Sequence, residues 1–312
     1  MIERKNKLAI VIPTKDRPEL VERLLDSIKD QTQLPDQIII ADGGDEPIND
    51  DLIGRFPELP IDRVGIRPPG LTKQKNAGVA AVKPGIDLVG ILDDDIVLET
   101  GALESMFSFW ANAEDKIGGA CFNITNARPI DAMVTQMLKK IFFIDNRELG
   151  SVSKSGCVTP IWDAQETMPV RWLGGGYTTW RMILFDRWEF DEWFPANGLL
   201  EDVHFSYRAG KEYQLMVVAD AKVQHIEAHV SNKGEVLLGK RQMTHWVYFV
   251  SNHKDLSMAM CLWSCVGRMS VNLTRGIMRH DMGLTARAFG NLQGLGMVGL
   301  AAIIPGRPRA RA

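Results

Sequence analysis

The sequence lacks three features that would each assign it to a familiar class. It has no basic excess, because 36 Lys and Arg stand against 39 Asp and Glu and leave a net charge of −3, so no nucleic-acid partner is indicated. It has only four cysteines and no CxxC pair, which argues against a disulfide framework or a zinc site and favours reduced thiols. The apolar run that ends at Pro13 is too short for a signal-peptide core, so we expect a cytoplasmic protein.

The composition is that of a soluble globular protein. Of the 312 residues, 45% are hydrophobic and 24% are charged, which excludes a disordered chain and suffices for one large domain or two tightly joined halves.

The first hundred residues alternate between strand-like and helix-like segments. The strand-like runs are 8–12, 37–41, 61–66 and 87–92, and helical spacing covers 18–28 and 72–82. This alternation predicts an α/β fold with a mostly parallel central sheet flanked by helices. In such a sheet, ligands bind beyond the carboxyl ends of the strands.

Polar clusters follow three of these strands, at 14–16, 42–45 and 93–95. The triplet Asp93, Asp94 and Asp95 directly follows an apolar run, although adjacent carboxylates repel one another and resist burial. Carboxylates at positions i and i+2 suit a Mg²⁺ or Mn²⁺ ion that is shared with a diphosphate. The alternative is an acidic cap on the helix that follows.

A second acidic pair, Glu201 and Asp202, precedes a predicted helix through Phe205 and Arg208. By itself this pair also fits a helix N-terminus. His225 ends a strand-like run, where a neutral imidazole could join carboxylates around Mn²⁺ or simply be hydrogen-bonded.

Taken together, these segments resemble the family 2 glycosyltransferases of the GT-A fold, over roughly residues 8 to 252. The matching segments occur in the family's order: VIPTKDRPELVERLLDSI, IIIADGGD, KQKNAG, ILDDD as the DXD motif, and GLLEDVHFSYRAGK as the ED motif. The resemblance implies an inverting, metal-dependent transfer from a nucleotide-diphosphate-sugar to a saccharide or lipid-linked saccharide, in cell-surface or exopolysaccharide biosynthesis.

The resemblance also implies roles for individual residues. Those expected to bind the nucleotide-sugar are Pro13, Thr14, Asp16, Asp42, Lys75, Asn76, Asp93 and Asp94. Lys75 stands where the family usually has Arg, which loses bidentate phosphate recognition and keeps the charge.

The remaining roles concern the metal, the catalytic base and the acceptor. A divalent metal, Mn²⁺ or Mg²⁺, would be held by Asp95, Asp93 and His225. Asp202 would take the proton from the acceptor hydroxyl while Glu201 contacts a sugar. The acceptor side would include Trp172, Gly175 and Gly176, although core packing is the alternative for the tryptophan.

We expect a GT-A catalytic domain at 1–230, with a nucleotide-binding half at 1–120 and an acceptor half at 121–230. A helical region follows at 231–312. Its segment 256–278 is apolar with arginines, which favours an interfacial helix and peripheral attachment to the cytoplasmic face of a membrane. A helical hairpin packed on the catalytic domain, or across a homodimer, is the alternative. The uncharged stretch 288–306 lies near the lower bound of ~17 to 25 residues for a membrane span.

Two competing functions differ in the residues they require. A sugar-phosphate nucleotidylyltransferase should carry a Gly-rich loop with Arg and Lys after its first strand, and VIPTKDRPE lacks those glycines. A catalytically inactive carbohydrate-binding protein of the same fold would have little reason to keep both acidic motifs. The sequence does not distinguish a UDP-, GDP- or dTDP-sugar donor.

Overall fold

The computed structural model describes residues 6–126, 133–144, 148–195, 198–226 and 232–303. The chain forms two compact units. The first unit comprises Met1–Ala127 and Ile161–Glu227, and the second comprises Arg128–Pro160 and Ala228–Ala312. The break after Glu227 lies close to the boundary that we expected at residue 230. Segment 128–160, which we had assigned to the acceptor half, groups with the C-terminal helices instead, because its helix packs on one of them.

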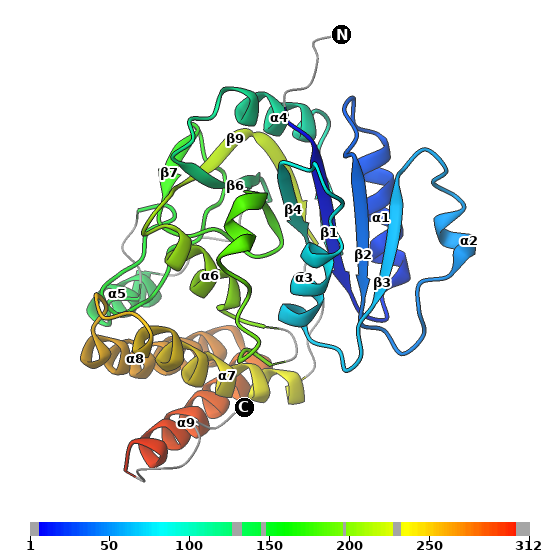
Figure 1. The fold of residues 1–312 in the computed structure, drawn as a ribbon. Helices are drawn as coiled ribbons and strands as arrows, with labels where there is room; N and C mark the ends of the chain where they lie inside the picture. Colours follow the sequence, from blue (N-terminus) through cyan, green and yellow to red (C-terminus); the bar gives the residue numbers. More distant parts are fainter. Residues whose placement is uncertain (1–5, 127–132, 145–147, 196–197, 227–231, 304–312) are drawn as a thin grey trace. The chain divides into compact units, whose positions relative to one another are not determined.

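The first unit is built on one nine-stranded sheet (Figure 1). Its strands are β1 (Leu8–Thr14), β2 (Gln37–Asp42), β3 (Ile61–Gly65), β4 (Leu88–Leu92), β5 (Ile96–Leu98), β6 (Ile117–Ile124), β7 (Met168–Val170), β8 (Tyr177–Arg181) and β9 (Gln214–His225). The order is β3-β2-β1-β4-β8-β6-β9-β5, with β7 also paired to β9. The sheet is therefore mixed in direction.

Parallel pairing dominates the N-terminal half of this sheet, where β1 pairs with β2 and β4, and β2 pairs with β3. In β1, β2 and β4 alternate side chains point to opposite sides of the sheet, and all of them are buried, so both faces of these three strands are covered. Leu8, Ile10 and Ile12 join the apolar cluster with helices α1 and α4, whereas α3 packs on β1 and β2 from the other side. Burial on both faces explains why these strands are continuous apolar runs.

The other half of the sheet contains the antiparallel pairs. Strand β8 runs antiparallel to both β4 and β6, and β5 and β7 run antiparallel to β9. Strand β9 is continuous over twelve residues, although its apolar pattern is interrupted at 219–221. The exposed Asp220 lies at a register shift of the β6–β9 pairing, so a bulge interrupts the apolar pattern without ending the strand.

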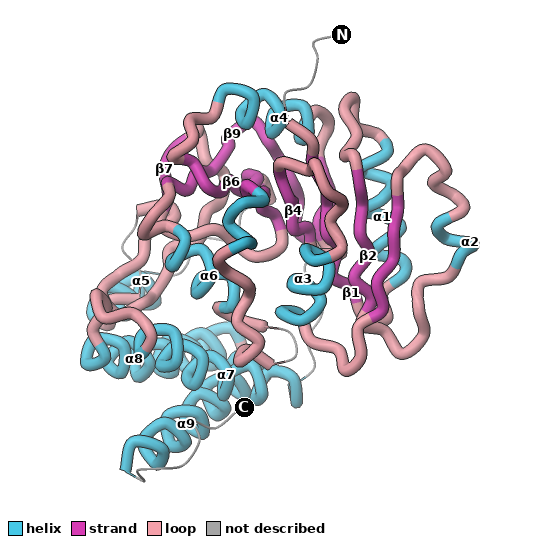
Figure 2. The backbone as a smooth tube through the Cα atoms, viewed as in Figure 1, coloured by secondary structure: helices cyan, strands magenta, loops and turns pink. Residues whose placement is uncertain are grey.

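The helical segments of the first unit lie in the connections between these strands (Figure 2). They are α1 (Pro18–Lys29), α2 (Asp50–Ile53), α3 (Leu71–Ala80), α4 (Ala102–Asn112), the 3-10 helix η1 (Met182–Asp186) and α6 (Glu201–Ala209). Helix α1 begins with Pro18 at its first position, where the missing N–H costs no hydrogen bond. The helices predicted at 18–28 and 72–82 are thus confirmed to within two residues.

The second unit is helical. It contains α5 (Met133–Ile141), α7 (Asn232–Ser251), α8 (Met258–Arg279) and α9 (Met282–Ile303). Helix α9 packs against both α7 and α8, and α5 packs on α8. Residues 304–306 of the uncharged stretch lie outside the described residues. Among the described helices, none combines the length and the apolar character needed to cross a membrane.

Candidate active site

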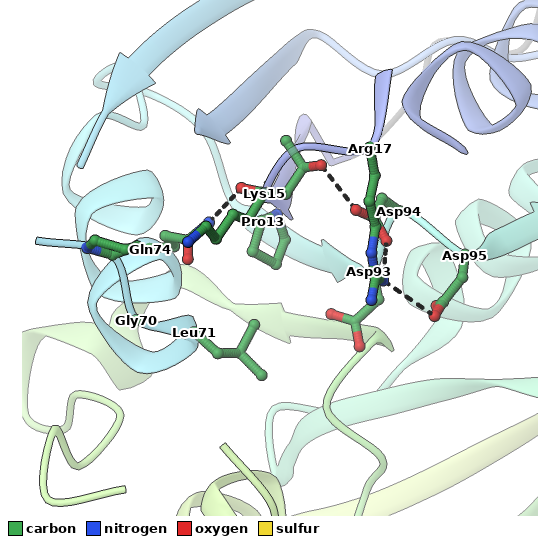
Figure 3. A pocket seen from close by; sticks show the side chains of 11 residues that line it. Pro13, Lys15, Arg17, Gly70, Leu71, Gln74, Asp93, Asp94 and Asp95 are labelled. Carbon is green, nitrogen blue, oxygen red and sulfur yellow. Dashed lines mark hydrogen bonds and ion pairs between the residues drawn. The ribbon is translucent and has the colours of Figure 1, made fainter. Parts of the chain in front are cut away.

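The acidic triplet lies beside the end of β1, because β1 and β4 are parallel neighbours in the sheet. A cavity of about 410 Å³ opens at this edge, within the range of roughly 300–1,000 Å³ that is usual for ligand sites. Its lining residues are Pro13, Thr14, Lys15, Arg17, Pro69, Gly70, Leu71, Gln74, Asp93, Asp94 and Asp95 (Figure 3). Five of the predicted site residues therefore line one cavity, namely Pro13, Thr14 and the three aspartates.

Asp94 is tied into this edge by two donors. The Thr14 hydroxyl donates to Asp94 Oδ2 at 2.7 Å, and Arg17 Nη1 donates to Asp94 Oδ1 at 3.2 Å (Figure 3). Burial raises the pKa of Asp94, although both donors act in the opposite direction. Asp94 thus fixes the triplet to β1 and to the start of α1.

Asp93 and Asp95 are less completely paired than Asp94. Within the described residues, Asp93 Oδ1 and Asp95 Oδ1 are buried and accept no hydrogen bond. Burial raises the pKa of Asp93 to about 6, and the neighbouring carboxylates add to this rise while Lys75 opposes it. Buried carboxylate oxygens without donors suit a hard divalent cation, which compensates their charge without a proton.

His225 lies next to the third aspartate of the triplet, because β5 pairs with β9 in a register that sets Ile96 opposite His225. Its Nε2 lies 3.4 Å from Asp95 Oδ1. Over the part of the chain that the structure describes, no three side chains of His, Cys, Asp or Glu gather as a metal-binding group. Proteins often hold Mg²⁺ through one or two carboxylates together with substrate phosphates, so the two orphaned oxygens still fit such an ion.

Lys75 is fully buried and forms an ion pair with the first residue of the ED motif. Its Nζ lies 2.9 Å from Glu201 Oε1 and 5.3 Å from the centroid of the Phe190 ring. Burial alone would lower the pKa of Lys75, but the charges of Glu201, Asp93 and Asp202 outweigh it and raise that pKa. One ammonium group therefore offsets three carboxylates, and it joins the two acidic motifs electrostatically.

Asp202 is held by two backbone donors. Gly175 N donates to Asp202 Oδ2 at 2.8 Å, and Val203 N donates to Oδ1 at 2.7 Å. Burial raises the pKa of Asp202 to about 7, and Glu201 adds to the rise while Lys75 and the two N–H groups reduce it. A carboxylate with this pKa can accept a proton near neutral pH.

Two adjacent glycines, Gly175 and Gly176, bring the two acidic motifs together. A Cβ on Gly175 would lie 2.8 Å from Asp202 Cβ, and one on Gly176 would lie 2.1 Å from Asp93 Oδ2. Asp93 N also donates to Gly176 O at 2.9 Å. The triplet and Asp202 therefore flank neighbouring residues of one loop, which only glycine accommodates at these distances.

The turn before the ED motif has an unusual backbone. Gly198, Leu199 and Leu200 have φ values of 71°, 80° and 69°. Positive φ costs a non-glycine residue about 1–3 kcal/mol and is concentrated at functional sites. This turn sets the direction in which α6 starts, and hence where Glu201 and Asp202 lie.

The other predicted site residues have structural partners outside the cavity lining. Both carboxylate oxygens of Asp42 accept backbone N–H groups, from Gly44 and Ile48, each at 2.7 Å. Asp16 accepts from Asp45 N. Asn76 donates to Phe190 O and accepts from Phe190 N, both at 2.9 Å.

Trp172 is buried, with 7% of its surface exposed, as core packing requires. The ligand roles assigned to Asp16, Asp42, Asn76, Trp172 and Lys75 stay predictions.

Arg17 and Gln74 are cavity residues to which the sequence reading gave no role. Gln74 Nε2 donates to Thr14 O at 2.7 Å and to Ala41 O at 2.9 Å, so it joins the ends of β1 and β2. Both residues lie inside the motif segments VIPTKDRPE and KQKNAG. Because Arg17 follows Asp16 and Gln74 precedes Lys75 in the sequence, their position next to predicted site residues could have indicated that they also line the site.

Comparison with known proteins shows a family match over part of the chain. The chain matches the family described as "Glycosyl transferase family 2" over residues 9–160. No curated protein sequence matches it.

Two solved structures share the fold. A mannosyltransferase, PcManGT from Pyrobaculum calidifontis in complex with GDP-Man and Mn²⁺, has a TM-score of 0.55 and 14% identity over 97% of this chain and 82% of that chain. TarS 1-349 from S. aureus has a TM-score of 0.54 and 13% identity over 95% of this chain and 82% of that chain.

The fold and the family match define a glycosyltransferase of the GT-A type. The family match is to glycosyltransferase family 2, which the resemblance in the sequence implied, and it covers residues 9–160.

Proposed function

We propose that the protein transfers a sugar, with inversion, from a nucleotide-diphosphate-sugar to a hydroxyl group of a saccharide or lipid-linked saccharide. The product would serve cell-surface or exopolysaccharide biosynthesis. The observation that carries this proposal is the buried Asp202, whose pKa is raised to about 7 and which shares Lys75 with Asp93. A proton acceptor thus lies beside the cavity edge where the donor diphosphate would bind.

In the proposed reaction the acceptor oxygen attacks the anomeric carbon while the bond from that carbon to the diphosphate oxygen breaks. The hydroxyl proton passes to Asp202, and the nucleoside diphosphate leaves with the electron pair. Attack on the face opposite the leaving group inverts the anomeric configuration. The two N–H groups that hold Asp202 fix the rotation of its carboxylate, which would keep it in place for the proton transfer.

Asp93 and Asp95, with His225 beside them, would hold a divalent ion. When bound, such an ion supplies positive charge opposite the departing diphosphate. Arg17 and Lys15 add protein cations to the same cavity. Lys75 keeps Glu201 in place and offsets the charge that develops when Asp93 and Asp202 are ionised.

Neighbouring structures support a nucleotide-sugar donor, since TarS has been crystallised with UDP and with UDP-GlcNAc, and PcManGT with GDP-Man and Mn²⁺. At 13–15% identity these likenesses concern the fold. The donor therefore has to be identified by assay.

The test is to incubate the purified chain with UDP-, GDP- and dTDP-sugars in Mn²⁺, in Mg²⁺ and in EDTA, and to measure the nucleoside diphosphate released. Release from one donor, dependent on metal and lost in Asp95→Asn, is the expected result. Release of pyrophosphate from a nucleoside triphosphate and a sugar phosphate would indicate a nucleotidylyltransferase instead. Binding of a donor without turnover, with every acceptor class tried, would indicate a carbohydrate-binding protein.

A further inference from the structure

The described part of the second unit exposes large apolar side chains on each of its helices, and two of these helices, α5 and α8, pack on each other. Helix α5 exposes Met133, Met137 and Ile141 to 86%, 57% and 48%. Helix α8 exposes Trp263, Leu273 and Ile277 to 47%, 44% and 64%. We call these six residues the α5–α8 face. Contiguous exposed apolar side chains of this kind mark an interaction site.

The two helices are held together next to Ile141 and Trp263, two residues of this face. The rings of Phe142 and Trp263 lie 4.8 Å apart. Trp263 Nε1 donates to Ile141 O at 3.2 Å, and Ser264 Oγ donates to Phe142 O at 2.6 Å. Helix α5, which lies far from the C-terminal helices in the sequence, therefore contributes three of the six residues of the α5–α8 face.

The interior of the same unit combines buried apolar side chains, among them Met243, Trp246 and Phe249, with hydrogen-bonded polar groups. Asn272 Nδ2 donates to Asn291 Oδ1 at 2.8 Å, and Asn291 Nδ2 donates to Gly239 O at 2.8 Å. Arg287 pairs with Glu235 through two hydrogen bonds. Because this interior is already packed, the large apolar groups on the outside are available to an apolar surrounding.

The charge of the two segments that carry this face distinguishes between a second copy of the chain and a lipid surface as its partner. Segments 133–143 and 256–280 contain five Lys or Arg and no Asp or Glu. Lys140 and Arg279 are exposed near the face. A second copy meeting this face through a two-fold axis would set cations against cations, whereas anionic lipid headgroups would neutralise them.

We propose that the α5–α8 face binds the surface of an anionic lipid bilayer and lies in the interface without crossing it. This inference is independent of the proposed function, since none of its residues belongs to the cavity.

The first test is flotation of the full chain with vesicles of phosphatidylglycerol and phosphatidylcholine, compared with phosphatidylcholine alone. We expect binding to the anionic vesicles. The variant M133Q/M137Q/L273Q/I277Q should lower the partition coefficient by roughly tenfold or more, because buried CH₂ groups dominate interfacial binding. Ile183→Gln is the matched control, since Ile183 is 59% exposed in the first unit, and it should bind like the unaltered chain.

Charge is tested separately with K140Q/R279Q, which should weaken binding to anionic vesicles by about fivefold for each cation removed. Lys116→Gln, on the first unit, should leave binding unchanged. Circular dichroism and donor turnover of all variants report whether they fold.

Three results would overturn the proposal. The first is that the unaltered chain fails to bind anionic vesicles, and the second is that the four-residue variant binds as well as the unaltered chain. The third is that sedimentation shows a dimer that this variant abolishes. The last result would assign the face to a second copy. If the four-residue variant does not fold, quenching by brominated lipids decides: the unaltered chain should be quenched more than Trp263→Phe, and equal quenching contradicts the proposal.

Discussion

The two units differ in where they expose apolar side chains. The first unit buries apolar side chains on both faces of its sheet and concentrates buried carboxylates at one edge, around Lys75. Among the described residues of this unit, Ile183 is the only large apolar side chain that is exposed. The described part of the second unit buries amides and an Arg–Glu pair among apolar side chains such as Met243 and Phe249, and it leaves many large apolar side chains exposed.

Each unit contains groups that lower its folding stability, and the position of these groups indicates a functional surface. Buried carboxylates with raised pKa values are unfavourable for folding, and their concentration at the sheet edge indicates a catalytic site. Exposed apolar groups are unfavourable in water, and their concentration on α5 and α8 indicates a partner surface.

The largest effect that we expect comes from the proposed base. Asp202→Asn keeps the size of the side chain but cannot accept the acceptor proton, so kcat/KM should fall by roughly 10²–10⁴-fold. Steady-state release of nucleoside diphosphate measures it. Asp186→Asn, at an exposed position of the same unit, should have no effect. An Asp202→Asn enzyme with nearly full activity would remove Asp202 as the base.

The buried ion pairs of the two units should differ in their contribution to stability. Lys75→Met leaves three buried carboxylates without their cation and should cost about 3–5 kcal/mol in the free energy of unfolding. Arg287 is 25% exposed, so water replaces part of its contact with Glu235, and Arg287→Met should cost about 1–3 kcal/mol. Urea unfolding compares the two. K75M/E201Q should recover part of the loss, and equal losses for the two single variants would contradict the contrast.

Activity and stability should respond to pH in opposite directions. The raised pKa of Asp202, about 7, means that the ionised base accumulates as the pH rises, so kcat/KM should increase by about tenfold per pH unit below 7 and level off above it. The same group holds a proton in the folded state between about pH 4 and pH 7 that the unfolded chain has released, so its contribution to stability falls as the pH rises. A pH–rate profile without a step near 7, in the unaltered enzyme, would contradict the assignment.

The smallest effect concerns the loop between the two acidic motifs. Gly176→Ala would place a methyl group 2.1 Å from the present position of Asp93 Oδ2, so the carboxylate must move, at a cost of about 1–3 kcal/mol. Thermal unfolding measures the stability loss, and the KM for the donor should rise with it. Gly65→Ala is the control, because nothing lies within 4 Å of a Cβ at that position. Equal effects of the two substitutions would show that the close approach to Asp93 is unimportant.

Local pattern was sufficient to predict the elements that carry the site. The apolar runs of the first four parallel strands, the helices that follow two of them and the acidic triplet at the end of β4 were all readable from the sequence. Periodicity and turn chemistry depend on neighbouring residues, which explains why these features could be predicted. The order of the five motif segments in the chain also sufficed to indicate the family.

Tertiary structure alone decided which of these residues meet. Lys75 and Glu201 are 126 positions apart, and their ion pair depends on how α3 and α6 pack, which no local pattern records. The same holds for the tie between Arg17 and Asp94, for the orphaned oxygens of Asp93 and Asp95, and for the attachment of α5 to α8. Burial and charge compensation depend on neighbours brought together by folding, so the electrostatics of the site and the apolar face of the second unit had to be read from the structure.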